Sequence, residues 1–172
     1  MLVSLNASFA TDGSIQLLRM NGAGLDRSPK MLANAWRNAE REGVSARLTL
    51  LAGDGLSLPF ADEMFSLVVC NSVLHHAREP VQLLRELFRV AAPDAAILLR
   101  DLRRPLRPLL RWHLWRHGRH YHGLMRRLFD ASVRASYTLD ELAELLHQAP
   151  LAGARPFRFR GAHIGIERRA GG

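Results

Sequence analysis

Residues 53–76 read GDGLSLPFADEMFSLVVCNSVLHH, and the run from Phe65 to Asn71 is apolar over nearly its whole length. A strand with this pattern is covered on both faces, which is typical of a central strand in a parallel sheet. Glycines flank Asp54 before the run, and polar residues follow it from Asn71 to His76. We therefore expect a buried parallel strand here, with polar residues placed directly after it.

Outward from this strand, short apolar runs alternate with amphipathic stretches, as strands alternating with helices do. Strands are predicted over 44–51, 65–71 and 95–102, helices over 28–43, 80–90 and 138–148, and a final pair of strands over 154–160 and 163–168. Thr138 and Glu141 match the capping-box pattern that begins a helix. The order favours an α/β fold with an open, mostly parallel sheet and right-handed crossovers.

The composition indicates one compact domain. The chain has 172 residues, of which 48% are hydrophobic and 23% charged. Its uncharged apolar runs are shorter than the ~20 residues that a membrane span needs, and Met1 to Met20 lacks the features of a secretory signal. A single cysteine, Cys70, excludes internal disulfides and thiolate metal sites. We expect a cytoplasmic protein without a bound metal.

Two carboxylates, Asp26 and Asp54, follow predicted strands and lie 28 positions apart. Ligands of open α/β sheets bind at the carboxyl ends of the strands, where one carboxylate can accept from ribose hydroxyls and a second from an exocyclic amine. This arrangement suits an adenosine. Taken singly, each aspartate is more often a helix cap or a turn residue.

Four ordered stretches carry a resemblance to a known family: GLDRSPKMLANA (24–35), the quoted segment 53–76, EPVQLLRELFRVAAPDAAILLRDLRRP (79–105) and SVRASYTLDELAELL (132–146). They resemble the class I S-adenosylmethionine-dependent methyltransferases, in particular the methyltransferase type 11 group with its ubiquinone and menaquinone C-methyltransferases. The resemblance is close over 22–104 and looser over 128–168. It implies a Rossmann-like methyltransferase fold for one domain over 1–172, with helices on both faces of the sheet and a C-terminal antiparallel strand pair.

The resemblance implies S-adenosyl-L-methionine as cofactor and assigns roles to residues of this chain. Asp26 would hold the ribose hydroxyls, Asp54 the adenine amino group, and the backbone at Gly55 and Leu56 the adenine edge. Met31 would flank the adenine, Asn71 and Ser72 would lie near the methionine part, and Leu74 and His75 would face the methyl group. The cofactor-binding set is thus Asp26, Arg27, Met31, Gly53, Asp54, Gly55, Leu56, Asn71, Ser72 and Leu74.

The first motif of the family departs from its pattern here. A glycine-rich turn should follow the first strand, yet the stretch from Leu2 to Ala10 has no glycine, and the first glycine is Gly13. A side chain at that turn would crowd the cofactor. Three interpretations stay open: an incomplete N-terminal part, a degenerate motif, or a non-catalytic relative. Asp12-Gly13 also fits the turn of a β-hairpin.

His75 and His76 are candidate bases, since histidine titrates near neutral pH and both follow a predicted strand. We select His75 as the candidate catalytic residue. A histidine in this position is more often a packing or hydrogen-bonding residue.

The net charge of +8 arises in residues 100–127, which hold nine arginines and one acid, Asp101. We predict a basic helical insertion or lid at about 103–130. It would cover an acidic or prenylated substrate, lie on an anionic membrane surface, or bind RNA through phosphates and stacked bases; a helical subdomain packed on the sheet is the plain alternative. His113, His117 and His120 have helical spacing, but the surrounding positive charge opposes a metal.

The function expected from these features is methyl transfer from S-adenosylmethionine to a small-molecule or lipid-like acceptor. Two alternatives remain open: an inactive or truncated methyltransferase-fold binding protein, favoured by the missing glycine motif, and an RNA-directed methyltransferase or RNA-binding module, favoured by the basic segment.

Overall fold

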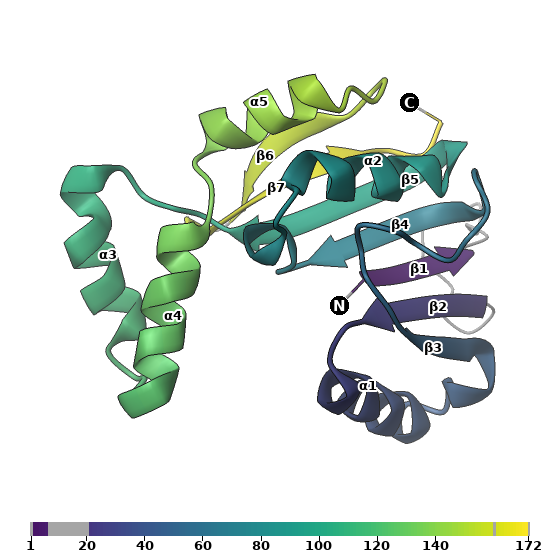
Figure 1. Cartoon of the computed structure of the whole chain (residues 1–172), viewed down its shortest axis with the longest axis horizontal. Helices are drawn as coiled ribbons and strands as arrows, with labels where there is room; N and C mark the ends of the chain where they lie inside the picture. Colours follow the sequence, from purple (N-terminus) through teal and green to yellow (C-terminus); the bar gives the residue numbers. More distant parts are fainter. Residues whose placement is uncertain (1, 7–20, 160, 172) are drawn as a thin grey trace, which may run out of the picture.

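The computed structural model describes residues 2–6, 21–159 and 161–171. Within these ranges seven strands form one sheet in the order β3-β2-β1-β4-β5-β7-β6 (Figure 1). The strands are β1 Leu2–Asn6, β2 Asn21–Asp26, β3 Leu48–Ala52, β4 Phe65–Asn71, β5 Ala91–Leu102, β6 Arg155–Phe159 and β7 His163–Arg168. The helices are α1 Pro29–Arg41, α2 Pro80–Arg89, α3 Arg107–Gly118, α4 Gly123–Ala135 and α5 Leu139–Gln148, with 3-10 turns η2 Ser45–Arg47 and η3 Leu74–His76.

The predicted α/β fold is confirmed. β2 pairs parallel with β3, and β4 pairs parallel with β5. At the end of the chain β7 runs antiparallel to both β5 and β6, which is the predicted C-terminal antiparallel pair. α1 connects β2 to β3 on one side of the sheet, and α2 connects β4 to β5 on the other side. The strand order therefore reverses between β2 and β4. In open α/β sheets this switch point is where ligands bind.

β1 occupies the switch point but runs antiparallel to both of its neighbours. Leu2 pairs with Leu25 and with Cys70, while Asn6 pairs with Asn21. β1 therefore begins beside the carboxyl ends of β2 and β4 and ends beside the residues at which these two strands begin. The rest of the stretch predicted to supply the first motif, and the predicted hairpin turn at Asp12-Gly13, lie outside the described residues.

Several local predictions are confirmed, and two strand boundaries were wrong. Ser28 caps α1, and both hydrogen bonds of the capping box form at the start of α5. The strand predicted from Val44 begins at Leu48 instead, because a 3-10 turn over η2 carries the chain to the sheet. The strand predicted from Ala95 begins at Ala91, because a register shift lets β5 continue past the proline within it.

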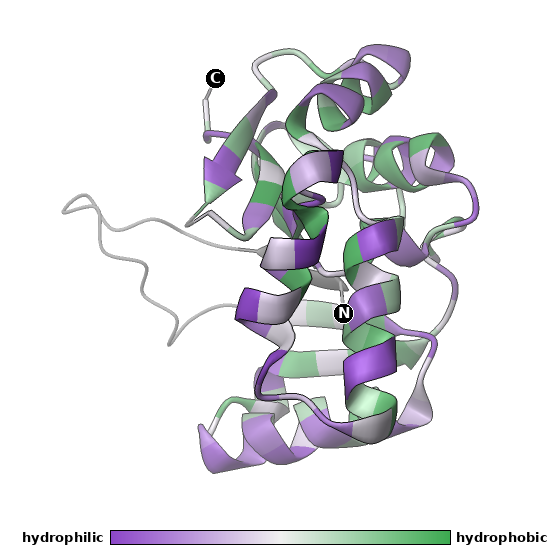
Figure 2. Cartoon of the chain, turned by 90° about the vertical axis from the view of Figure 1, so that its left-hand side faces the viewer, coloured by the Kyte–Doolittle hydropathy of each residue, from purple (hydrophilic) through white to green (hydrophobic). Residues whose placement is uncertain are grey.

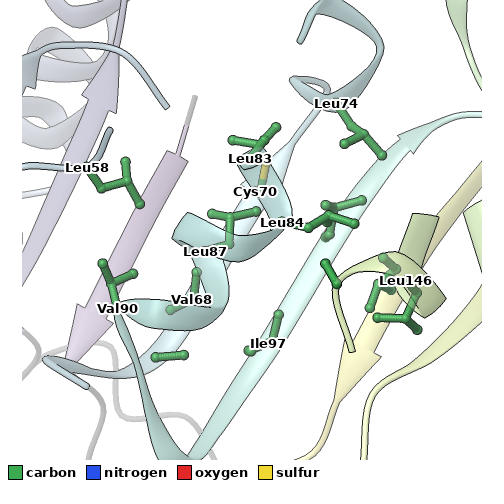
Figure 3. Packing of buried hydrophobic residues seen from close by; sticks show 14 of the residues in the cluster. Leu58, Val68, Cys70, Leu74, Leu83, Leu84, Leu87, Val90, Ile97 and Leu146 are labelled. Carbon is green, nitrogen blue, oxygen red and sulfur yellow. The ribbon is translucent and has the colours of Figure 1, made fainter. Parts of the chain in front are cut away.

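The core lies where α2 and α5 pack over β4, β5 and β7. Leu83, Leu84 and Leu87 of α2 are buried in one cluster with Val68, Cys70 and Ile97 of the sheet, and Figure 3 shows Leu83 next to Cys70. Burial in this cluster raises the pKa of the Cys70 thiol to about 12, so the thiol stays protonated. The packing fixes β4 and α2, and with them the η3 turn between the two elements.

Candidate functional site

A cavity of about 390 Å³ opens at the carboxyl ends of β2, β3 and β4. It falls within the size range of small-molecule sites. Its lining residues come from the end of β2, from the segments that follow the three strands and from the start of α2: Leu25, Asp26, Arg27, Gly53, Asp54, Gly55, Leu56, Ser72, Val73, His76, Ala77, Arg78, Glu79 and Leu83.

Asp26 ends β2, and its position is fixed by the start of α1. Its Oδ1 accepts a hydrogen bond of 2.8 Å from the Ser28 amide, and the Ser28 hydroxyl accepts from the Met31 amide at 3.4 Å. An ionised carboxylate has about four acceptor positions, so such a group can accept from a ligand in addition to holding hydrogen bonds within the protein.

Asp54 belongs to the turn after β3. Its Oδ1 accepts from the Leu56 amide at 3.0 Å, and its Oδ2 lies 4.0 Å from Nη1 of Arg27. Both side chains of this ion pair are largely exposed, so it contributes little stability. A Cβ added at Gly53 would lie 2.9 Å from Leu25 Cδ1, so a side chain there would require Leu25 to move.

Ser72 follows β4 in a left-handed conformation, with φ at +55°. This conformation is uncommon for a residue with a side chain, and such residues cluster at functional sites. The Ser72 amide donates a 2.8 Å hydrogen bond to the Arg100 carbonyl of β5, which holds the turn against the sheet. The chain is thus redirected along the cavity wall.

His75 does not line the cavity. Its ring is buried against Asp101 of β5, with Nδ1 2.5 Å from Oδ1. The other carboxylate oxygen of Asp101 accepts from the His75 amide at 3.0 Å. The pairing with Asp101 turns the His75 ring into the protein and away from the cavity, whereas the resemblance implied that this residue faces the methyl group.

His76 lines the cavity instead. Its ring centroid lies 3.9 Å from that of His75. The pKa of His76 is lowered below its ordinary value of 6.5, mainly because the ring is partly buried and secondly because His75 lies beside it. Sequence analysis did not predict that His76, rather than His75, lines the cavity. A 3-10 turn has three residues per turn, so adjacent side chains point to different sides. The resemblance assigned His75, and not His76, to the side that faces the ligand.

The cavity brings together seven of the residues predicted to bind cofactor: Asp26, Arg27, Gly53, Asp54, Gly55, Leu56 and Ser72. Three others lie elsewhere. Met31 is exposed on α1, Leu74 is fully buried in the core, and Asn71 accepts a 2.9 Å hydrogen bond from Nε of Arg100. Sequence analysis did not predict that most of the segment from Val73 to Glu79 lines the cavity. Its position directly after a predicted strand could have indicated this.

The predicted basic insertion consists of α3 and α4, which we call the α3–α4 hairpin (residues 107–135). It leaves the carboxyl end of β5, the same edge as the cavity, and α4 packs against η3 (Figures 1 and 2). None of the helices described is long and apolar enough to cross a membrane. Within the described ranges, no group of three or more His, Cys, Asp or Glu residues is placed to hold a metal.

The fold agrees with comparisons to known proteins. The Methyltransf_11 family model, described as a methyltransferase domain, matches residues 8–99. The chain therefore belongs to this family of class I S-adenosylmethionine-dependent methyltransferase domains. A crystal structure of the YcgJ protein from Bacillus subtilis is 27% identical, with a TM-score of 0.59, and the match covers 79% of this chain and 54% of that one. A SAM-dependent methyltransferase from Aquifex aeolicus, 19% identical, has the same fold with a TM-score of 0.61 over 84% of this chain and 66% of that one.

Among curated proteins, demethylmenaquinone methyltransferase of Roseiflexus castenholzii is 31% identical over 60% of this chain and 48% of its own length. Norajmaline N-methyltransferase of Rauvolfia serpentina is 33% identical over 44% of this chain and 26% of its own length. The chain thus spans about half or less of the length of these curated relatives.

Proposed function

We propose that the protein transfers a methyl group from S-adenosyl-L-methionine to a small apolar molecule, with a quinone-like ring as the first candidate acceptor. The observation that carries the proposal is the cavity at the switch point, with Asp26 and Asp54 on its wall. Menaquinone-pathway and alkaloid methyltransferases among the relatives support a small-molecule acceptor.

The donor and acceptor chemistry of the cavity fits the cofactor. Vicinal ribose hydroxyls need acceptors, and Asp26 offers carboxylate oxygens next to the start of α1. An exocyclic amine needs a further acceptor, and Asp54 stands at the end of the neighbouring strand. The glycines on either side of Asp54 leave the backbone open to a flat ring. We assign these two residues to the ribose and the adenine respectively.

The cofactor supplies an activated methyl group on a sulfonium, so the protein needs chiefly to align the acceptor with it. Where the acceptor loses a proton, we assign His76 as the group that takes it. His76 lines the cavity, and its lowered pKa keeps the imidazole neutral at pH 7, the form that can accept a proton. His75 is then a positioning residue, held by Asp101 and in ring contact with His76.

The experiment that tests the proposal is transfer of radiolabelled methyl from S-adenosylmethionine to a demethylnaphthoquinone kept in its reduced hydroquinone form, whose ring carbon is nucleophilic. Label is expected in the organic extract, and it should fall when Asp26 is replaced by asparagine. A folded chain that binds the cofactor but labels none of a panel of quinones and amines would overturn the assignment of a small apolar acceptor.

A further inference from the structure

The α3–α4 hairpin exposes large apolar side chains that the sheet does not cover. On α3, Leu109, Trp112 and Trp115 recur at three-residue spacing, and the two tryptophans are 59% and 58% exposed. On α4, Leu124, Met125 and Leu128 are likewise exposed. Figure 2 shows green and purple residues interleaved along both helices. An apolar surface of this kind marks an interaction site.

The same hairpin is strongly basic. Residues 107–135 contain seven arginines and one acid, Asp130, which is paired with Arg126 at 2.9 Å. Arg111 and Arg116 flank the two tryptophans in sequence, and neither forms an ion pair with a described carboxylate. The surface thus combines apolar rings with unneutralised guanidinium groups, so its occupant has to be both apolar and anionic.

A second cavity, of about 420 Å³, lies at the base of the hairpin. Arg104, Arg107 and Arg134 line it together with Leu106 and Leu110, and Glu141 is its one carboxylate. Because Arg104 is paired with Glu141, two of the three arginines stay in excess. Guanidinium groups beside leucines suit a phosphate that carries an apolar tail.

We propose that the α3–α4 hairpin docks onto the surface of an anionic phospholipid bilayer. The tryptophans and leucines enter the boundary between headgroups and acyl chains, and the arginines contact lipid phosphates, with the basal cavity taking one headgroup. This inference does not depend on the proposed reaction, since it rests on the hairpin and its basal cavity.

Two other occupants fit less well. RNA would meet the arginines with phosphates and the tryptophans with bases, but it would leave the exposed leucines and Met125 in water. A second copy of the chain would bring two arginine-rich surfaces together, and like charges oppose such an interface. A bilayer with anionic headgroups satisfies both the charge and the aliphatic side chains.

The test is cosedimentation of the purified chain with vesicles of phosphatidylcholine alone and of phosphatidylcholine with phosphatidylglycerol. We expect binding to the anionic vesicles, weakening as salt rises, and little binding to phosphatidylcholine. Replacing both Trp112 and Trp115 by serine should weaken binding by about tenfold or more. Arg111→Gln should weaken it about fivefold.

The matched control is Trp36→Ser, which removes the remaining tryptophan, an exposed one on α1 outside the hairpin. It should bind vesicles as the unchanged protein does. Circular dichroism and thermal melting establish that each variant folds. Soluble glycerol phosphate should not displace the protein from vesicles.

The proposal would be overturned by equal binding to both vesicle types, by full binding of the double tryptophan variant, by displacement of the protein from vesicles by glycerol phosphate, or by tighter binding to an RNA oligonucleotide that competes with vesicles. A dimer in light scattering that the double tryptophan variant abolishes would assign the surface to self-association instead.

Discussion

The cavity is lined by three carboxylates and two arginines together with glycines and small or apolar side chains, whereas the neighbouring α3–α4 hairpin has seven arginines against one carboxylate and exposes large apolar groups. Both regions follow the carboxyl ends of strands in the same sheet. The cavity residues are held in place by hydrogen bonds from backbone amides, such as those from the Ser28 amide to the Asp26 carboxylate and from the Ser72 amide to the Arg100 carbonyl. The hairpin instead leaves much of its apolar surface in solvent. We infer that the first region is built for a fixed polar ligand and the second for a partner that is both apolar and anionic.

The largest expected effect is a difference in stability between a substitution in the core under α2 and a substitution on the α3–α4 hairpin. Leu84 is fully buried on α2, while Leu124 on α4 is 62% exposed. Leu84→Ala should lower the free energy of unfolding by about 3 kcal/mol through lost transfer energy and a cavity. Leu124→Ala should change it by less than about 0.5 kcal/mol. Urea denaturation measures both, and similar losses would show that the hairpin surface is part of the core.

The next effect concerns the base assigned in the cavity. Because the pKa of His76 lies below 6.5, its neutral form should predominate above that pH, and the rate should decline as the pH falls through the lowered value. His76→Gln should reduce kcat about 100-fold and remove this acid limb. A pH profile of kcat/KM measures it. An unchanged limb in the variant would assign the titrating group to another residue.

A smaller expected effect is the difference in stability between substitutions of two carboxylates outside the α3–α4 hairpin, Asp101 and Asp62. Asp101 is buried and accepts from the ring and the amide of His75, whereas Asp62 pairs with Arg89 at the surface. Asp101→Asn should destabilise the fold by about 2 kcal/mol, since it disrupts a buried charged hydrogen bond. Asp62→Asn should cost less than about 1 kcal/mol. Equal costs in thermal or urea unfolding would contradict the role given to Asp101 in holding His75.

The sequence predicted those features that are encoded locally. β4 has the predicted bounds because its sequence is apolar over nearly its whole length, and α5 begins directly after Thr138 because this N-cap residue and its partner Glu141 are three residues apart. The aspartates and glycines after β2 and β3 line the cavity because strand ends meet at one edge of the sheet. Chain order alone was enough to bring them together.

Features that depend on distant partners could not be predicted. The direction of β1 is set by pairing with β2 and β4, and no local pattern encodes it. His75 turns inward because Asp101, 26 positions later, accepts its hydrogen bonds. The sequence of the hairpin segment predicted helices and positive charge. The exposure of Trp112 and Trp115 could not be predicted, because it depends on how α3 packs against its neighbours.

The most direct test of the cofactor assignment is calorimetric titration of the chain with S-adenosylhomocysteine, alongside Asp26→Asn and the control Glu40→Ala, an exposed carboxylate on α1. Asparagine keeps an oxygen for the Ser28 amide but offers a donor where ribose hydroxyls need acceptors. The account predicts binding by the unchanged chain and by the control, and binding about 10- to 100-fold weaker in Asp26→Asn. A folded chain that does not bind, or an Asp26→Asn variant that binds equally well, would contradict it.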